Sequence, residues 1–117
     1  LREIDFSAEF NGDELKLIQA IKLGDLEKDE VLKKRFTDWL NQEAEKAEKS
    51  GDFADQILMS LRRAKLLFQA ASYNDAFREA MDARTYAENM QGQLGEEADY
   101  IIDESNRILL SVVEKSK

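Results

Sequence analysis

The chain has 117 residues, of which 43% are hydrophobic and 36% are charged, and its formal net charge is −8 at pH 7. This length suits one domain, and the hydrophobic fraction is sufficient for a packed core. An acidic surface repels the phosphates of nucleic acids and of anionic lipids. We therefore expect neither nucleic acid nor a membrane as a partner.

Three residue types are absent, and each absence narrows the possible chemistry. Without cysteine the chain can form no disulfide, thiolate metal site or cysteine nucleophile. Without histidine it lacks the commonest general base and the commonest transition-metal ligand. The absence of proline is typical of a helical protein. No stretch contains the ~20 apolar residues that a membrane span requires, and the compartment stays open, with a slight preference for the cytoplasm.

The first ten residues, LREIDFSAEF, alternate apolar and polar side chains as a strand does, with apolar positions at Ile4, Phe6, Ala8 and Phe10. The remaining sequence offers no second strand for pairing. We therefore expect residues 1–12 to form an extended arm whose phenylalanines dock on a helical domain, residues 13–117. The alternative is that the arm contacts a partner chain or another part of a longer protein.

Glycine-containing turn signals divide the rest of the chain into runs that are rich in Ala, Leu, Glu, Lys and Arg. These runs predict helices at about residues 13–24, 27–50, 53–71, 74–91 and 96–115. The expected fold is all-α, a four- to five-helix bundle.

The two middle helices differ in their apolar pattern. Residues 27–50 carry one apolar face, formed by Leu32, Phe36, Trp39, Leu40 and Ala47. Glu43 falls on that face, and we expect it at the rim, paired with an arginine. Residues 53–71 carry apolar side chains on two opposite sides, which predicts that this helix lies at the centre of the bundle. The two sides consist of Ile57, Leu61, Ala64, Phe68 and Ala71, and of Met59, Leu66 and Ala70.

The last two helices are predicted to pack closely. Small side chains form a stripe along residues 74–91, at Ala76, Ala80, Ala83 and Ala87. Such a stripe allows two helices to approach at the short end of the usual separation. The helix at 96–115 has a broad apolar face that the third or fourth helix must cover, formed by Ala98, Ile101, Ile102, Ile108, Leu109, Val112 and Val113.

The acidic segments do not match a known metal site. In DLEKDE, the position that an EF-hand reserves for glycine holds Glu30, and the position of its bidentate glutamate holds Phe36. This segment fits the first turn of a helix better, because acids complement the helix dipole there. Di-iron bundles require histidine. Two carboxylate pairs, Asp99 with Asp103 and Glu79 with Asp82, are read as solvated surface acids.

Glycines never cluster in a phosphate-binding pattern. We therefore expect no enzyme, no cofactor and no bound metal. The remaining catalytic alternative is a metal-dependent enzyme that uses carboxylates alone.

Residues 57–90, ILMSLRRAKLLFQAASYNDAFREAMDARTYAENM, resemble one tetratricopeptide repeat, a helix–turn–helix unit of about 34 residues. The positions that this motif favours hold Ala64, Leu67, Ala71, Tyr73, Ala76 and Ala83. Ser60 replaces an aromatic residue of the motif, and its closing proline is missing. The chain is therefore either part of a repeat array or a self-contained bundle with a repeat-like hairpin. The hairpin is also similar to microtubule-interacting-and-transport domains and to small archaeal helical domains.

The resemblance implies a non-catalytic protein–protein interaction module that binds a protein or peptide, such as an amphipathic helix. The predicted contact residues are Leu58, Lys65, Phe77, Met81 and Arg84. The alternative is a homo-oligomer in which these residues and the arm cover a sister chain. Five cations, Arg62, Arg63, Lys65, Arg78 and Arg84, are expected to pair with the chain's own acids. The competing interpretation is a groove for an anionic peptide.

Overall fold

The computed structural model describes residues 4–115, so residues 1–3 of the predicted arm and residues 116–117 lie outside it. Within the described range the fold is all-α, as predicted, and contains no strand. In chain order the elements are the 3₁₀ helix η1 (Ser7–Glu9), α1 (Gly12–Leu23), α2 (Glu30–Ser50), α3 (Phe53–Gln69), α4 (Tyr73–Asn89), α5 (Gln91–Leu94) and α6 (Glu96–Lys115).

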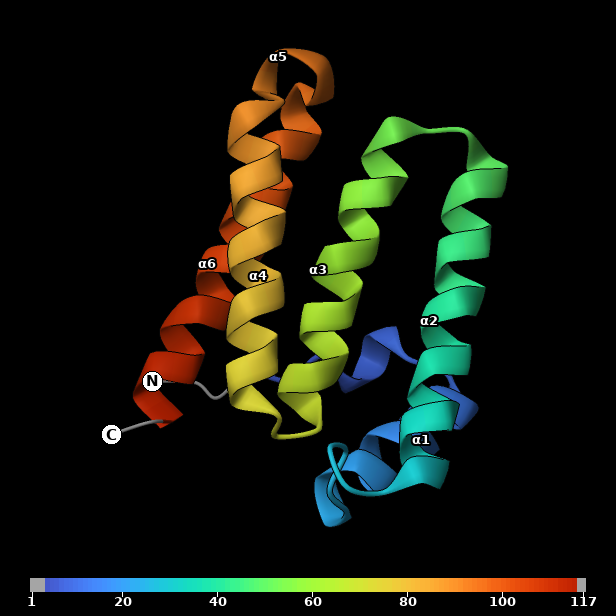
Figure 1. Ribbon diagram of the computed structural model, residues 1–117. Helices are drawn as coiled ribbons and strands as arrows, with labels where there is room; N and C mark the ends of the chain where they lie inside the picture. The colour runs from blue at the N-terminus through green and yellow to red at the C-terminus, as the bar shows by residue number, and fades with distance from the viewer. Residues whose placement is uncertain (1–3, 116–117) are drawn as a thin grey trace.

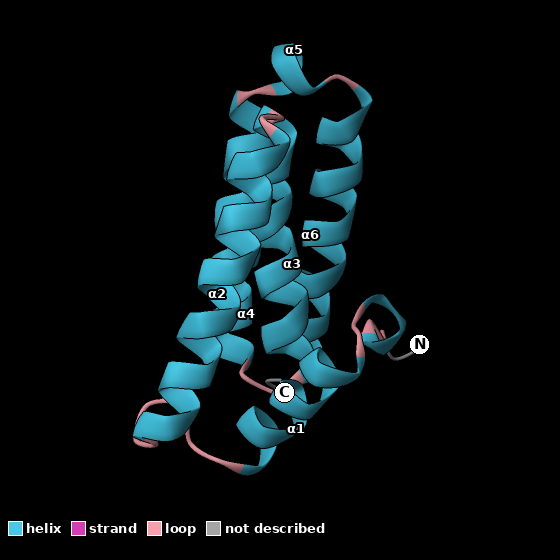
Figure 2. Cartoon of the chain, turned by 90° about the vertical axis from the view of Figure 1, so that its right-hand side faces the viewer, coloured by secondary structure: helices cyan, strands magenta, loops and turns pink. Residues whose placement is uncertain are grey.

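Helix α3 is the centre of the bundle, as its two apolar sides predicted. It packs against α1, α2, α4 and α6. Helices α3, α4 and α6 form a closed three-helix unit, and α2 leans on the other side of α3 (Figure 1). Helix α1 lies across the base of α2 and α3, and α5 joins α4 to α6 at the opposite end (Figure 2).

The alanine stripe of α4 is completely buried. Ala76, Ala80, Ala83 and Ala87 have no exposed surface, and they are the only buried residues of this helix. Helix α4 packs along both α3 and α6, because alanine side chains allow the neighbouring helices to approach closely. Helix α6 covers its own apolar face against these two helices, which confirms that prediction for Ile101, Ile108, Leu109 and Val112.

The turn between α3 and α4 closes sooner than the sequence predicted. Helix α3 ends at Gln69 rather than near residue 71. Ala71 adopts a left-handed conformation with φ 61°, and the Ser72 backbone N–H donates to the Leu67 carbonyl at 2.9 Å. This bond closes the end of a helix around a left-handed residue. The antiparallel α3–α4 pair exists, and its identity as a tetratricopeptide repeat stays a prediction.

The connection before α2 and the connection after α4 differ from the predicted ones. Helix α2 begins at Glu30, not near residue 27, since the backbone amides of Lys28 and Asp29 both bond to the Asp25 carbonyl and form a turn. The Asp29 side chain then accepts the amides of Val31 and Leu32, so it caps α2. Between α4 and α6 the predicted turn contains the four-residue helix α5.

The alternating pattern predicted an extended N-terminal arm, but the arm is not extended throughout. Residues 7–9 coil into one 3₁₀ turn, held by a bond from the Glu9 amide to the Phe6 carbonyl. The expected docking is confirmed, because Phe6 and Phe10 are both buried in the main hydrophobic core. The 3₁₀ turn directs both phenylalanines toward the bundle.

The alanine stripe leads to a prediction about stability. Ala83→Leu would force a larger side chain between α4 and its neighbours, and we expect it to lower the free energy of unfolding by about 1–3 kcal/mol. Ala44→Leu places the same change at an exposed position of α2, and it should have an effect within about 0.5 kcal/mol. Urea denaturation measures both. Equal effects of the two substitutions would contradict this description of the packing.

Candidate interaction surfaces

The five predicted contact residues do not form one surface. Phe77, Met81 and Arg84 share one face of α4, at steps of four and three residues. Leu58 lies on α3 next to α2, where it lines a pocket. Lys65 is only 3% exposed, so its side chain offers almost no accessible surface to a partner.

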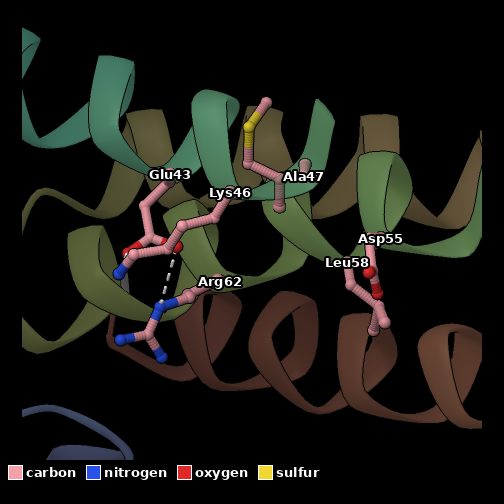
Figure 3. A pocket seen from close by; sticks show the side chains of 7 residues that line it. Glu43, Lys46, Ala47, Asp55, Leu58 and Arg62 are labelled. Carbon is pink, nitrogen blue, oxygen red and sulfur yellow. Dashed lines mark ion pairs between the residues drawn. The ribbon is translucent and has the colours of Figure 1, made fainter. Parts of the chain in front are cut away.

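The pocket beside Leu58 is a shallow hollow between α2 and α3 with a volume of about 180 Å³. Figure 3 shows Glu43 and Lys46 of α2 facing Arg62 of α3, with Leu58 and Asp55 farther along the same helix. The Arg62 guanidinium lies 3.4 Å from the Glu43 carboxylate, which confirms the predicted pairing of this rim acid. Ligand pockets usually exceed ~300 Å³, so this hollow is too small for most of them.

The cations of α3 and α4 pair with acids of the same chain, which confirms the expected internal pairing. The pairs are Arg62 with Glu14 and Glu43, Arg63 with Glu79, Lys65 with Glu9 and Glu104, Arg78 with Asp75, and Arg84 with Glu88. Because each has an acidic neighbour, these cations do not form an unneutralised basic groove.

Glu14 organises the junction of α1, α2 and α3. Its carboxylate accepts the indole N–H of Trp39 at 2.8 Å and the Arg62 guanidinium at 2.6 and 2.7 Å. It also accepts the Asn11 amide, which completes a capping box at the start of α1. Burial alone would raise the pKa of Glu14, but these hydrogen bonds outweigh it and hold the pKa below the ordinary 4.5.

Lys65 organises the junction of the arm, α3 and α6. Its ammonium lies 3.0 Å from the Glu9 carboxylate, 3.1 Å from that of Glu104 and 3.4 Å from the Tyr100 hydroxyl. Burial alone would lower the pKa of Lys65, but the hydrogen bonds and charges of the two carboxylates outweigh burial and raise it. Sequence reasoning missed this role because both acids are distant in the chain.

A strip of exposed apolar side chains follows the seam between α4 and α6. Arg84 of α4 donates to Asn106 of α6 at 3.0 Å, which sets the register of this antiparallel pair. Phe77 lies two turns before Arg84 in α4, and Val113 lies two turns after Asn106 in α6. These two residues therefore stand at the same level of the seam.

Met81 follows Phe77 by one turn of α4, and Leu110 precedes Val113 by one turn of α6. We call Phe77, Met81, Leu110 and Val113 the apolar strip. Phe77 is 38% exposed, Leu110 68% and Val113 48%, while Met81 is partly buried against the core. The sequence had suggested burial for Val113, which is wrong, and it did not single out Leu110. The apolar face of α6 is wider than α3 and α4 together cover.

Within residues 4–115 no group of three or more acidic side chains is arranged to hold a metal ion. Glu79 of one suggested carboxylate pair is bound to Arg63 at 3.1 Å. In the same part of the chain, no helix combines the length and apolar character needed to cross a lipid bilayer.

Comparisons of the chain with protein-family models, curated proteins and solved structures found no match.

The lowered pKa values of Glu14 and Glu104 predict a loss of stability in acid. A carboxyl whose pKa is lower in the folded state than in the unfolded state stabilises the fold at pH values above its unfolded-state pKa. This contribution disappears as the pH falls through the folded-state pKa. With no histidine present, stability should change little between about pH 5.5 and 8 and then decline below about pH 4.5.

The substitution Glu14→Gln tests whether the ionised carboxylate of Glu14 stabilises the fold. We expect a cost of about 2 kcal/mol at pH 7, because the guanidinium of Arg62 loses a charged acceptor. The gap to the unsubstituted protein should narrow as the pH falls below the ordinary 4.5 and Glu14 itself becomes protonated. Urea denaturation over this pH range gives both curves, with Glu27→Gln at an exposed position as the control. Parallel curves would contradict the assignment.

Proposed function

We propose that this protein is a non-catalytic protein–protein interaction module whose contact surface is the apolar strip. The observation that supports the proposal is the exposure of Phe77, Leu110 and Val113 on one face of the α4–α6 pair. Contiguous exposed apolar surface is a feature of interaction sites, whereas single exposed apolar residues are common. Six other large hydrophobic side chains are exposed. Three of them lie at helix ends, namely Leu23, Val31 and Phe53, and the others are Leu15, Tyr86 and Tyr100.

The shape of the strip suits an amphipathic helix. It runs along the seam between two antiparallel helices, and its four side chains are spaced by single helical turns. A partner helix can place its own apolar face on such a seam, with anchors three and four residues apart. Met81 adds a flexible and polarisable side chain that adapts to different shapes. Arg84, which the sequence also predicted as a contact residue, lies one turn beyond Met81 on α4. There it can contact the polar edge of the partner helix.

Charge favours a different protein over a second copy of this chain. Two copies with a net charge of −8 repel each other. A neutral or basic amphipathic helix meets no such repulsion. The proposed partner is therefore a helix of opposite or low net charge, and Leu58 and Lys65 are not part of its binding surface.

Site-specific photo-crosslinking tests this proposal. A photo-reactive amino acid at Leu110 should give a discrete crosslinked product with another protein in an extract of cells that make this chain, because that position lies within the contact. The same probe at Lys49, exposed on α2, is the matched control. Phe77→Asp should abolish the product at position 110 while leaving the thermal unfolding temperature nearly unchanged, since Phe77 is partly solvent-exposed.

Equal products at positions 110 and 49, or a product at 110 that survives Phe77→Asp, would contradict the proposal. Either result would mean that the crosslink does not depend on the apolar strip.

A further inference from the structure

The N-terminal arm forms a short turn with hydrogen bonds of its own. The amides of Glu9 and Phe10 donate to the carbonyls of Phe6 and Ser7, at 2.9 and 3.2 Å. The Asp5 carboxylate accepts the Ser7 amide at 2.9 Å. Hydrogen bonds from the Ser7 side chain and from this amide lower the pKa of Asp5. Residues 5–10 therefore form a compact turn that presents two phenylalanines and the Glu9 carboxylate to the bundle.

The bundle receives this turn on a face that consists of Arg62, Lys65, Phe68 and Gln69 of α3 with Glu104 and Arg107 of α6, which we call the arm-docking face. The Phe6 ring meets the edge of Phe68 with ring centres 6.0 Å apart, and the Phe6 amide donates to the Gln69 side chain at 2.9 Å.

Cations cover both aromatic rings of the arm. The guanidinium of Arg62 lies 4.8 Å from the centre of the Phe10 ring, and the ammonium of Lys65 lies 5.1 Å from that of Phe6. Cations at this distance are attracted to the faces of aromatic rings. The arm-docking face therefore recognises two aromatic side chains four residues apart, through packing and through charge.

Lys65 requires an acid in the ligand. Its ammonium is buried, and one of its two carboxylate partners is Glu9 of the arm. Removing that partner would leave a buried cation with only part of its compensating charge, which is strongly unfavourable. A segment that replaces the arm must therefore bring a carboxylate to the position that Glu9 occupies.

Helix α1, which follows the arm, has attachments of its own to the bundle. Helix α1 begins with a capping box between Asn11 and Glu14, and Glu14 is bound to Trp39 and Arg62. These contacts attach the start of α1 to α2 and α3. Beside the arm, a hollow of about 430 Å³ extends past Phe68 toward Tyr73, so the same face has room for a ligand longer than the arm.

We propose that the arm-docking face is a peptide-binding site, that residues 4–10 occupy it within the chain, and that its external ligand is an acidic peptide segment. The segment carries two aromatic residues four positions apart, with a glutamate directly before the second. The arm acts as an internal competitor, because a tethered segment has a high effective concentration. This site lies on α3 and α6 beside the arm and does not include any residue of the apolar strip.

The test uses the full chain and a fluorescent peptide of sequence IDFSAEFN, which copies residues 4–11. Glu9→Lys places a second cation beside Lys65 and weakens the arm, while its exposed position limits damage to the fold. Anisotropy should show that the peptide binds the Glu9→Lys chain more than about tenfold more tightly than the unsubstituted chain, because the competing arm is released.

Two controls locate the binding on the arm-docking face. A peptide with both phenylalanines replaced by alanine should not bind. Gln69→Ala, added to the Glu9→Lys chain, removes the acceptor of the Phe6 amide and should weaken binding by about threefold to tenfold. Circular dichroism and thermal unfolding of each variant establish that the chain is folded.

Three results would overturn the proposal. One is no binding to a folded Glu9→Lys chain. Another is equal binding to both chains, since the arm would then not compete. The third is a mass that doubles with concentration in the unsubstituted chain and returns to the monomer value on adding peptide, because the occupant would then be the arm of a second copy. None of these depends on the crosslinking at Leu110, so the two proposals fail separately.

Discussion

The close packing of α4 between α3 and α6 is the constraint on which the rest of the fold depends. Every buried side chain of α4 is an alanine, so this helix contributes contact at short range and little side-chain volume. The core of the three-helix unit is filled by the larger residues of the two neighbours, among them Leu61, Leu66, Ile101 and Ile108, which have 2% or less of their surface exposed. Close approach of the backbones and the dispersion contacts that it permits stabilise the unit.

The same constraint explains where the exposed apolar surface lies. With alanines on its inner face, α4 places its bulky apolar residues on the flanks, and Phe77 and Met81 lie on the flank that borders α6. Helix α6 has an apolar face that is broader than α3 and α4 can cover, so Val113 and Leu110 remain on the outer side of the seam. The apolar strip is therefore a consequence of how the core closes.

The charged side chains of α3 attach the N-terminal arm to the bundle. Arg62 and Lys65 pass their aliphatic stems along apolar surface and place their charged groups among acids from distant parts of the chain. Through them, the central helix joins α1, the arm and α6. The two surfaces thus arise from different helix faces, one apolar and one charged.

Short-range patterns predicted the fold well and the sites only in part. The alanine spacing identified the seam, the two apolar sides of residues 53–71 identified the central helix, and the position of Glu43 predicted its pairing with an arginine. Lys65 was assigned to an exposed surface because its partners Glu9 and Glu104 are separated from it by 56 and 39 residues. No local periodicity reports such contacts. The exposure of Val113 depends on how far neighbouring helices reach, which the pattern of one helix does not show.

The central claim is that the apolar strip serves a different protein and not a second copy of this chain. Solution mass by light scattering across a wide range of concentration tests it most directly, on the unsubstituted chain and on Phe77→Asp. We expect the monomer mass for both chains at every concentration. A dimer that forms as the concentration rises, and that Phe77→Asp abolishes, would assign the strip to self-association and contradict the account.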